Sequence, residues 1–217
     1  VELKANVSEK SIAVLPFVNM SADKDNEYFS DGISEEILNA LVKVADLKVA
    51  GRTSSFYFKG KNESLITIGE TLGVANVLEG SVRKQGEKVR ITAQLIRTKD
   101  GFHLWSETYD GDLKDVFALQ EKIAQAITTQ LQVILQGDQK NRLVQVGTSN
   151  TEAYALYLQA TAIFNSREGA RFAEAIEMLK KAIELDPQYA RAHSRLAALY
   201  FVNSHYAGGM AYSKRLA

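Results

Sequence analysis

The sequence predicts an α/β (α+β) amino-terminal domain with a mixed sheet, followed by all-α helical hairpins. Three observations lead to this fold class. The apolar run 11–17 contains β-branched residues and is typical of a buried strand. Residues 76–84 and 88–97 flank Gln85-Gly86-Glu87, which is a hairpin signal. Beyond residue 151 the apolar residues recur at helical spacing.

The first helix is expected to begin at Asp31, whose carboxylate can cap free backbone N–H groups. Glu35 and Glu36 would then lie favourably in the first turn. The apolar stripe of this helix is Ile33, Ile37, Leu41 and Val44. A second strand over 47–50 is expected to end in a polar turn at 51–55. Capping accounts for the three carboxylates, and with no histidine nearby in sequence an acid/base pair or metal site is disfavoured.

The rest of this domain is expected to alternate between helices and strands. A short helix over 65–72 precedes the hairpin, and Gly73 suits its left-handed carboxyl end. The second hairpin arm alternates between apolar and polar residues, and 103–109 makes a further strand. A long helix from about 116 to 135 follows. The predicted order is β-α-β-α-β-β-β-α.

The carboxyl-terminal part is expected to form antiparallel helix pairs. Helices over 151–166 and 170–185 make the first pair, and 190–203 begins another. The second helix carries two small residues, a larger apolar one between them and a proline beyond its end. These are Ala175, Ala182, Leu179 and Pro187, and Leu196, Ala197 and Tyr200 share a face of the third helix. Small residues at this spacing let helices approach closely, and the proline ends the second helix.

These elements predict the domain organisation. Residues 1–10 are a linker, 11–136 are the α/β domain, 137–150 are a polar linker, and 151–217 are about one and a half helical repeats. The sequence begins and stops within recognisable patterns, so we interpret it as a piece of a longer protein.

Composition narrows the function classes. Lys+Arg and Asp+Glu number 26 each, so the formal net charge is zero and no nucleic-acid partner is indicated. Cysteine is absent, which excludes disulfides and thiolate chemistry. The three histidines lack metal-ligand spacing, and no serine lies in a nucleophile elbow. No apolar run approaches the ~20 residues that span a bilayer.

Phrases throughout the amino-terminal domain resemble the TolB-like amino-terminal domain family. They are 11–17, 28–33, 49–55, 68–74 and 77–82, with further likeness at 94–96, 103–105 and 109–110. The helical part resembles tetratricopeptide (TPR) repeats at Ala175, Leu179, Ala182, Pro187, Leu196, Ala197 and Tyr200. Tyr157 and Phe164 fit an earlier repeat if the turn between its helices is longer than usual. This pairing is typical of bacterial multidomain cyclase, winged-helix regulator and kinase proteins.

The resemblance implies a non-catalytic sensory and protein-interaction region of a larger bacterial signalling protein. The output module would be a nucleotide cyclase or a transcriptional regulator. The implied partner is a protein or peptide, self-association is a second option, and no cofactor or nucleic acid is implied. Membrane contact would come only through a transmembrane segment outside this chain. The resemblance favours the periplasm or a membrane-tethered position and leaves the cytoplasm open.

Two sets of candidate site residues remain. The loop Arg52, Thr53, Ser54 and Ser55 follows a strand and combines a cation with hydroxyls, so it could hold an anion or small ligand. An ordinary turn is the favoured interpretation. Candidate protein-binding residues are Trp105, Tyr109, Tyr157, Tyr189, His193 and Tyr200. Burial is favoured for the first two, because aromatic residues in strands more often pack than bind.

Overall fold

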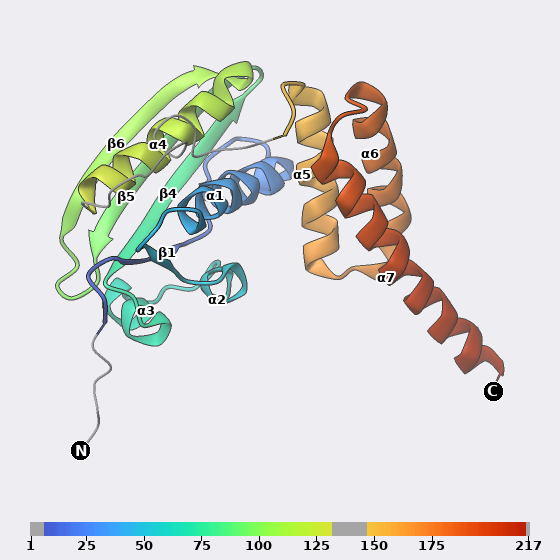
Figure 1. Cartoon of the computed structure of the whole chain (residues 1–217), viewed down its shortest axis with the longest axis horizontal. Coiled ribbons are helices and arrows are strands. Elements are labelled where there is room, and N and C mark those ends of the chain that lie inside the picture. The colour runs from blue at the N-terminus through green and yellow to red at the C-terminus, as the bar shows by residue number, and fades with distance from the viewer. Residues whose placement is uncertain (1–6, 132–146, 216–217) are drawn as a thin grey trace. The chain divides into compact units, whose positions relative to one another are not determined.

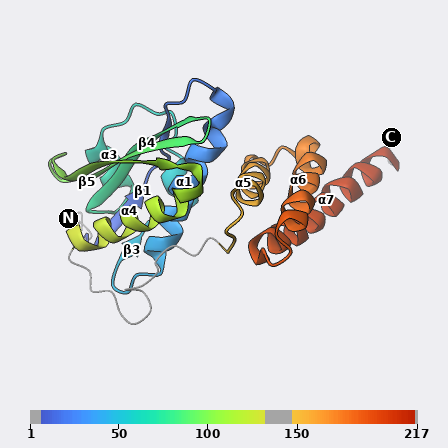
Figure 2. The ribbon, with the colours of Figure 1, turned by 90° about the horizontal axis from the view of Figure 1, so that it is seen from above.

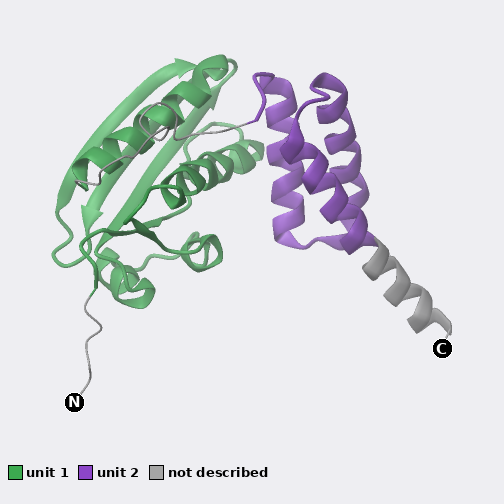
Figure 3. Ribbon diagram, in the orientation of Figure 1, with its two compact units in different colours: residues 1–145 green, residues 146–217 purple. Residues whose placement is uncertain are grey.

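The computed structural model describes residues 7–131 and 147–215, and the side chains of 7–131 and 147–203. The chain divides into two compact units, Val1–Gln145 and Val146–Ala217 (Figure 3). No helix in the described part of the chain is both long and apolar enough to cross a bilayer. The predicted end of the long helix beyond 131, most of the predicted linker 137–150 and residues 1–6 lie outside the described residues.

The amino-terminal unit is built on a six-stranded mixed sheet. Strands follow the order β3-β1-β4-β5-β6, and β2 pairs separately with β4. β1 is parallel to β3 and β4, whereas β5 is antiparallel to its neighbours β4 and β6. The strands are β1 Ser11–Val14, β2 Val18–Asn19, β3 Lys48–Val49, β4 Asn76–Gln85, β5 Lys88–Arg97 and β6 His103–Asp112. The mixed sheet confirms the predicted fold class.

Two helices, α1 (Glu27–Val42) and α4 (Val116–Gln130), lie side by side on one face of this sheet (Figures 1 and 2). The side of the sheet beneath them is apolar because every second residue of β5 points the same way. Those residues are fully buried: Val89, Ile91, Ala93 and Leu95. The alternation predicted for the second hairpin arm therefore forms one side of the core.

The opposite face is covered only where the parallel strands lie. Here α2 (Arg52–Phe56) contacts β1 and α3 (Leu65–Leu72) contacts β4. A second apolar cluster fills the contact: Ala13, Leu15, Phe58, Ile68, Val74 and Val77. Gly69 of α3 faces Thr98 so closely that a Cβ atom would clash with the threonine side chain. The Thr98 hydroxyl in turn donates to the carbonyl of Val74 at 2.9 Å.

Two local predictions were wrong. Helix α1 begins at Glu27 rather than Asp31, after a 3-10 turn over Lys24–Asn26 that Asp23 caps. Asp31 therefore lies inside the helix and does not cap it. The expected turn at 51–55 is instead the short helix α2, preceded by Gly51 in an extended conformation. In both places the polar residues predicted a boundary at a position where the backbone is helical.

The carboxyl-terminal unit is helical, as predicted (Figure 3). Its helices are α5 Thr151–Ser166, α6 Phe172–Leu185 and α7 Ala190–Arg215. Asn150 caps α5 by accepting backbone N–H groups of Glu152 and Ala153, both at 3.0 Å. The connection to α6 contains Arg167 in the left-handed region, with φ of 58°, and a 3-10 turn at Gly169–Arg171.

Small buried residues bring the helices of this unit together. Ala175, Leu179 and Ala182 of α6 are fully buried, and α6 contacts both α5 and α7. Helix α6 ends at Leu185, two residues before Pro187. On α7, Leu196 is half-buried, whereas Ala197 is exposed.

We expect Gly80→Ala to lower the free energy of unfolding by about 1–3 kcal/mol, the usual cost of overpacking. A Cβ at this position of β4 would clash with the carbonyl of Thr92 and lie 2.7 Å from the Phe17 ring. Urea unfolding measures the change. Gly51→Ala is the matched control, since a Cβ there meets no atom within 4 Å. Equal stability of the Gly80 variant and the wild type would contradict this account of the core.

Candidate functional site

Arg52 of the predicted ligand loop forms an ion pair with Glu35 of helix α1. Its Nε lies 2.7 Å from Oε2 of Glu35, and its guanidinium carbon lies 4.0 Å from the centroid of the Phe56 ring. Thr53 and Ser54 are exposed, whereas Ser55 is fully buried. The cation that an anion ligand would need is therefore already neutralised by a carboxylate of the same unit.

A second cation joins the same two segments. Nζ of Lys59 lies 2.6 Å from Asp31 and 2.8 Å from Glu27. Glu27, Asp31 and Glu35 follow one another at four-residue spacing, which places them along one face of α1. This acidic row, defined by these three residues, fastens the segment 52–59 to α1. The spacing of the carboxylates was visible in the sequence, but their partners are distant. Arg52 lies 17 positions from Glu35, and Lys59 lies 28 positions from Asp31.

Burial and pairing both act on the proton affinity of this cluster. Burial raises the pKa of the Asp31 carboxyl, although Lys59 pulls it down. Burial tends to lower the pKa of Lys59, but its hydrogen bonds and charge contacts with Asp31 and Glu27 raise it overall. Lys59 therefore stays charged, and the strength of the contact depends on the ionisation of Asp31. Such a cluster has a structural role that the fold alone accounts for.

Trp105 and Tyr109 lie on β6, at the edge of the sheet, and both are half-buried. They stand opposite Leu95 and Ile91 of β5, so they share the apolar side of the sheet. Their ring centroids are 6.3 Å apart. The Tyr109 hydroxyl donates to Glu107 at 2.6 Å. Burial is the larger cause, and the Glu107 carboxylate the smaller one, of a raised pKa of the Tyr109 phenol. The sequence analysis favoured burial of both rings, and the structure leaves each of them half-buried.

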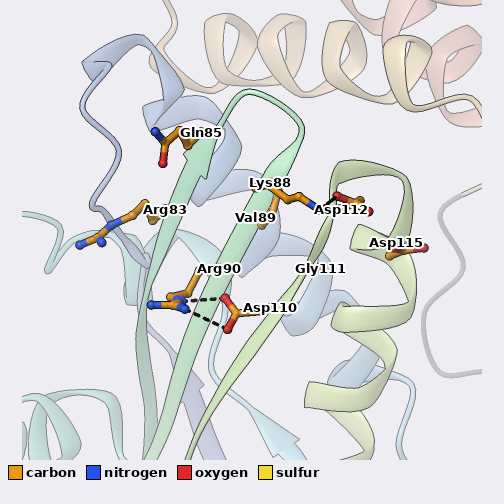
Figure 4. A pocket seen from close by; sticks show the side chains of 9 residues that line it. All are labelled: Arg83, Gln85, Lys88, Val89, Arg90, Asp110, Gly111, Asp112 and Asp115. Atoms are coloured by element: carbon orange, nitrogen blue, oxygen red, sulfur yellow. Dashed lines mark hydrogen bonds and ion pairs between the residues drawn. The ribbon is translucent and has the colours of Figure 1, made fainter.

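The polar face of the sheet carries a hollow of about 580 Å³ (Figure 4). Its charged lining residues are Arg83, Lys88, Arg90, Asp110, Asp112 and Asp115. Arg90 binds Asp110 through two contacts of 2.6 and 3.0 Å, and Lys88 lies 2.6 Å from Asp112. Positive and negative groups therefore alternate across neighbouring strands. Within residues 7–131 and 147–203, no cluster of three metal-ligating side chains occurs.

The four candidates for protein binding in the helical unit, Tyr157, Tyr189, His193 and Tyr200, differ in their exposure. Tyr157 and Tyr189 are buried, with exposed fractions of 4% and 0%, and their ring centroids are 5.2 Å apart. They hold the unit together and do not offer their rings to a partner, contrary to our prediction. His193 is exposed, and its Nε2 lies 3.0 Å from the carbonyl oxygen of Pro187. Tyr200 is 48% exposed and remains accessible.

Two arginines of α7 that the sequence analysis did not select lie over aromatic rings of α5. The guanidinium carbon of Arg191 lies 5.0 Å from the ring centroid of Tyr157, and that of Arg195 lies 4.7 Å from the ring centroid of Phe164. The two arginines are four residues apart on α7 and the two rings are seven apart on α5, so each pair shares a helix face. That spacing was present in the sequence, but the pairing of the two faces required the fold.

Both units match models of known protein families. Residues 8–126 match the model of the second domain of HilA/YgeH-like transcriptional regulators. The chain belongs to this family. Residues 167–212 match a TPR repeat, which confirms the TPR resemblance. The pairing of a regulator-associated α/β domain with repeats was predicted, and it identifies a protein-interaction and regulatory region.

A curated relative extends this comparison. The protein named "Putative adenylate cyclase 3" from Rhizobium meliloti (strain 1021) is 41% identical over 192 residues, covering 88% of this chain. The chain spans 33% of the length of that relative.

Solved structures similar to part of this chain include TolB from Acinetobacter baumannii, at 16% identity and a TM-score of 0.42, covering 58% of this chain and 29% of that one. Lipoprotein GNA1162 from Neisseria meningitidis has 22% identity and a TM-score of 0.41, covering 48% and 80%. The LpoB C-terminal domain from Salmonella enterica has 18% identity and a TM-score of 0.39, covering 50% and 87%.

We expect Lys59→Met to destabilise the protein by about 1 kcal/mol near neutral pH, the upper range for a partly exposed ion pair. Because Lys59 pulls the pKa of Asp31 down, its removal raises that pKa further. Asp31 already binds its proton more tightly in the folded chain. Its ionisation therefore costs stability as the pH rises above its ordinary value of 3.8. The cost of the substitution shrinks as the pH falls and Asp31 becomes protonated.

Carboxyl-carbon NMR titration of Asp31 and urea unfolding across pH measure these two effects. Lys61→Met is the matched control, since the Lys61 ammonium lies 2.9 Å from the centroid of the Tyr57 ring. Its cost should not follow the titration of Asp31. A cost for the Lys59 variant that is the same at every pH would show that Asp31 is not its energetic partner.

Proposed function

We propose that the chain is the non-catalytic sensory and docking region of a larger bacterial signalling protein, with an adenylate cyclase-like or transcriptional output. The family match to transcriptional regulators and the relative named as an adenylate cyclase support a regulatory setting. The chain corresponds to a third of that relative, so the proposal assigns catalysis to a different part of such a protein.

The exposed aromatic pair on α7 is the observation that carries the docking role. Tyr200 and Phe201 are 48% and 71% exposed, next to each other on a helix of the TPR unit. Large aromatic side chains are enriched among residues that contribute most to protein–protein binding. By contrast, Arg90 and Lys88 in the hollow of the amino-terminal unit already hold carboxylates. The proposal therefore assigns partner contact to the helical unit.

The alternative of an anion- or small-ligand-binding loop at 51–55 loses its main support. Its cation, Arg52, is paired with Glu35, and its backbone forms a helix. The hollow of Figure 4 and two smaller ones on residues 7–131 are lined by residues other than Arg52, Thr53, Ser54 and Ser55.

The proposal includes a place outside the cytoplasmic membrane, either periplasmic or membrane-tethered, which the sequence resemblance favours. A fusion of alkaline phosphatase after residue 217 of the longer protein would be active only outside the cytoplasm. Activity of a matching cytoplasmic reporter, together with an inactive phosphatase fusion, would refute this part of the proposal.

We expect the isolated chain to form no cyclic AMP from ATP with Mg²⁺ or Mn²⁺. In the hollow of Figure 4, Lys88 and Arg90 are held by Asp112 and Asp110, so these charged groups are engaged in ion pairs rather than arranged around a substrate. Chromatographic detection of cyclic AMP measures this. Turnover that persists through purification and scales with the amount of chain would contradict the non-catalytic assignment.

Photo-crosslinking tests the docking surface directly. A photoreactive phenylalanine analogue in place of Tyr200 should give a specific higher-mass adduct in cells that produce the longer protein. The same analogue in place of Tyr57, which is 65% exposed on the amino-terminal unit, is the matched control. Adducts from position 57 alone, or from neither position, would contradict docking through the helical unit.

A further inference from the structure

We propose that the amino-terminal unit binds an α-amino acid with an apolar side chain in a hollow beside the carboxyl end of β1. The hollow has a volume of about 390 Å³. It is lined by the chain that follows β1, by residues 58–61 after α2, and by neighbouring residues of β4 and β5. The site gives the proposed sensory role a chemical class of ligand, and it rests on that role.

The path of the chain places the hollow where open α/β sheets bind ligands. β1 lies between β3 and β4 and is parallel to both. The chain passes from β1 to β3 through α1, and from β3 back to β4 through α2 and α3 on the other face (Figure 1). Because the connections leave β1 in opposite directions, a crevice forms outside its carboxyl end. Leu15 and Pro16, which directly follow β1, line the hollow.

The floor of the hollow is a set of polar side chains from two paired strands. Glu79 of β4 stands opposite Gln94 of β5, and Ser81 stands opposite Thr92. All four residues are half-buried. Thr92 shares a hydrogen bond with a neighbouring threonine, whereas within residues 7–131 and 147–203 the other three side chains form none. Their carboxylate, amide and hydroxyl oxygens offer three acceptors, which is the number of N–H donors on an ammonium group.

The charges around the hollow favour a ligand that carries both signs. Lys59 already pairs with the acidic row of α1. Lys61 lies over the Tyr57 ring, 2.9 Å from its centroid. In the described part of the chain, neither Lys61 nor Glu79 forms an ion pair. The ammonium of an amino acid would pair with Glu79 and its carboxylate with Lys61, and such charge-assisted contacts are stronger than neutral hydrogen bonds.

The remaining wall of the hollow is apolar. Leu15 and Phe58 are buried, Pro16 is half-buried, and Val18 is 59% exposed. A ligand side chain laid against Val18 would remove apolar surface from water, which is favourable. Apolar walls with a few placed polar groups are typical of small-molecule sites, whose volumes are about 300–1,000 Å³.

NMR titration of the whole chain with L-leucine, L-valine and L-phenylalanine tests the site. We expect saturable shift changes at the backbone amides of Ser81 and Thr92 and at the side-chain amide of Gln94 for at least one of the three amino acids. Two analogues of leucine separate the charged contacts: isoamylamine lacks the carboxylate, and isocaproate lacks the ammonium. Each should bind about ten-fold or more weakly than leucine, because each loses one charge-assisted contact.

Substitutions assign the contacts to their residues. Glu79→Gln should weaken leucine binding about ten-fold or more and leave isocaproate within about two-fold. Lys61→Met should weaken leucine binding and leave isoamylamine unchanged. The matched control is Glu70→Gln, which removes the same charge from an exposed position of α3 outside the hollow. It should keep the affinity for leucine within about two-fold, since an exposed charge at a distance is screened.

The outcomes separate this site from the docking function. Absence of saturable changes with all three amino acids, or analogues that bind as tightly as leucine, would overturn the site, and both results are obtained on the wild-type chain. An equal loss in the Glu70 variant would also overturn it, because the effect would then follow net charge alone. None of these results alters the crosslinking at position 200, which tests docking by itself.

Discussion

The burial of one sheet face beneath α1 and α4 is the interaction on which the amino-terminal unit depends. It takes every second residue of β5 out of water, at about 25 cal/mol for each Å² of apolar surface. Because side chains alternate along a strand, the same arrangement turns the polar residues of β4, β5 and β6 to the other face. The polar hollow of Figure 4 is therefore a consequence of how the core is made.

The position of α1 also explains the ion pairs around it. With its apolar side against the sheet, the helix presents Glu27, Asp31 and Glu35 away from the core, where Lys59 and Arg52 meet them. Residues that resemble a ligand loop in sequence thus serve to fasten one segment to another. In the amino-terminal unit, carboxylates form ion pairs with these two cations. In the helical unit, Arg195 instead lies over the ring of Phe164.

Periodic features were predictable from the sequence. The alternation through Val89, Ile91 and Ala93 and the helical spacing of Ala175, Leu179 and Ala182 each repeat within one element, and burial of one face follows from them. Features that depend on distant partners were not predictable. Asp31 was predicted to cap a helix because its partner, Lys59, lies 28 residues further on and no local pattern links the two. The stacking of Arg195 on Phe164 depends on which faces of α5 and α7 meet, and no local pattern sets that pairing.

The outer position of β6 has a consequence for solubility. Among the described residues β6 is the last strand of the sheet, and a ten-residue edge strand presents a row of main-chain donors and acceptors to another molecule. Here that strand bears the charged side chains of Glu107, Asp110 and Asp112, and a second copy aligned against it would have to remove water from them. The free-energy cost of removing water from these charges limits uncontrolled growth of the sheet from one molecule to the next.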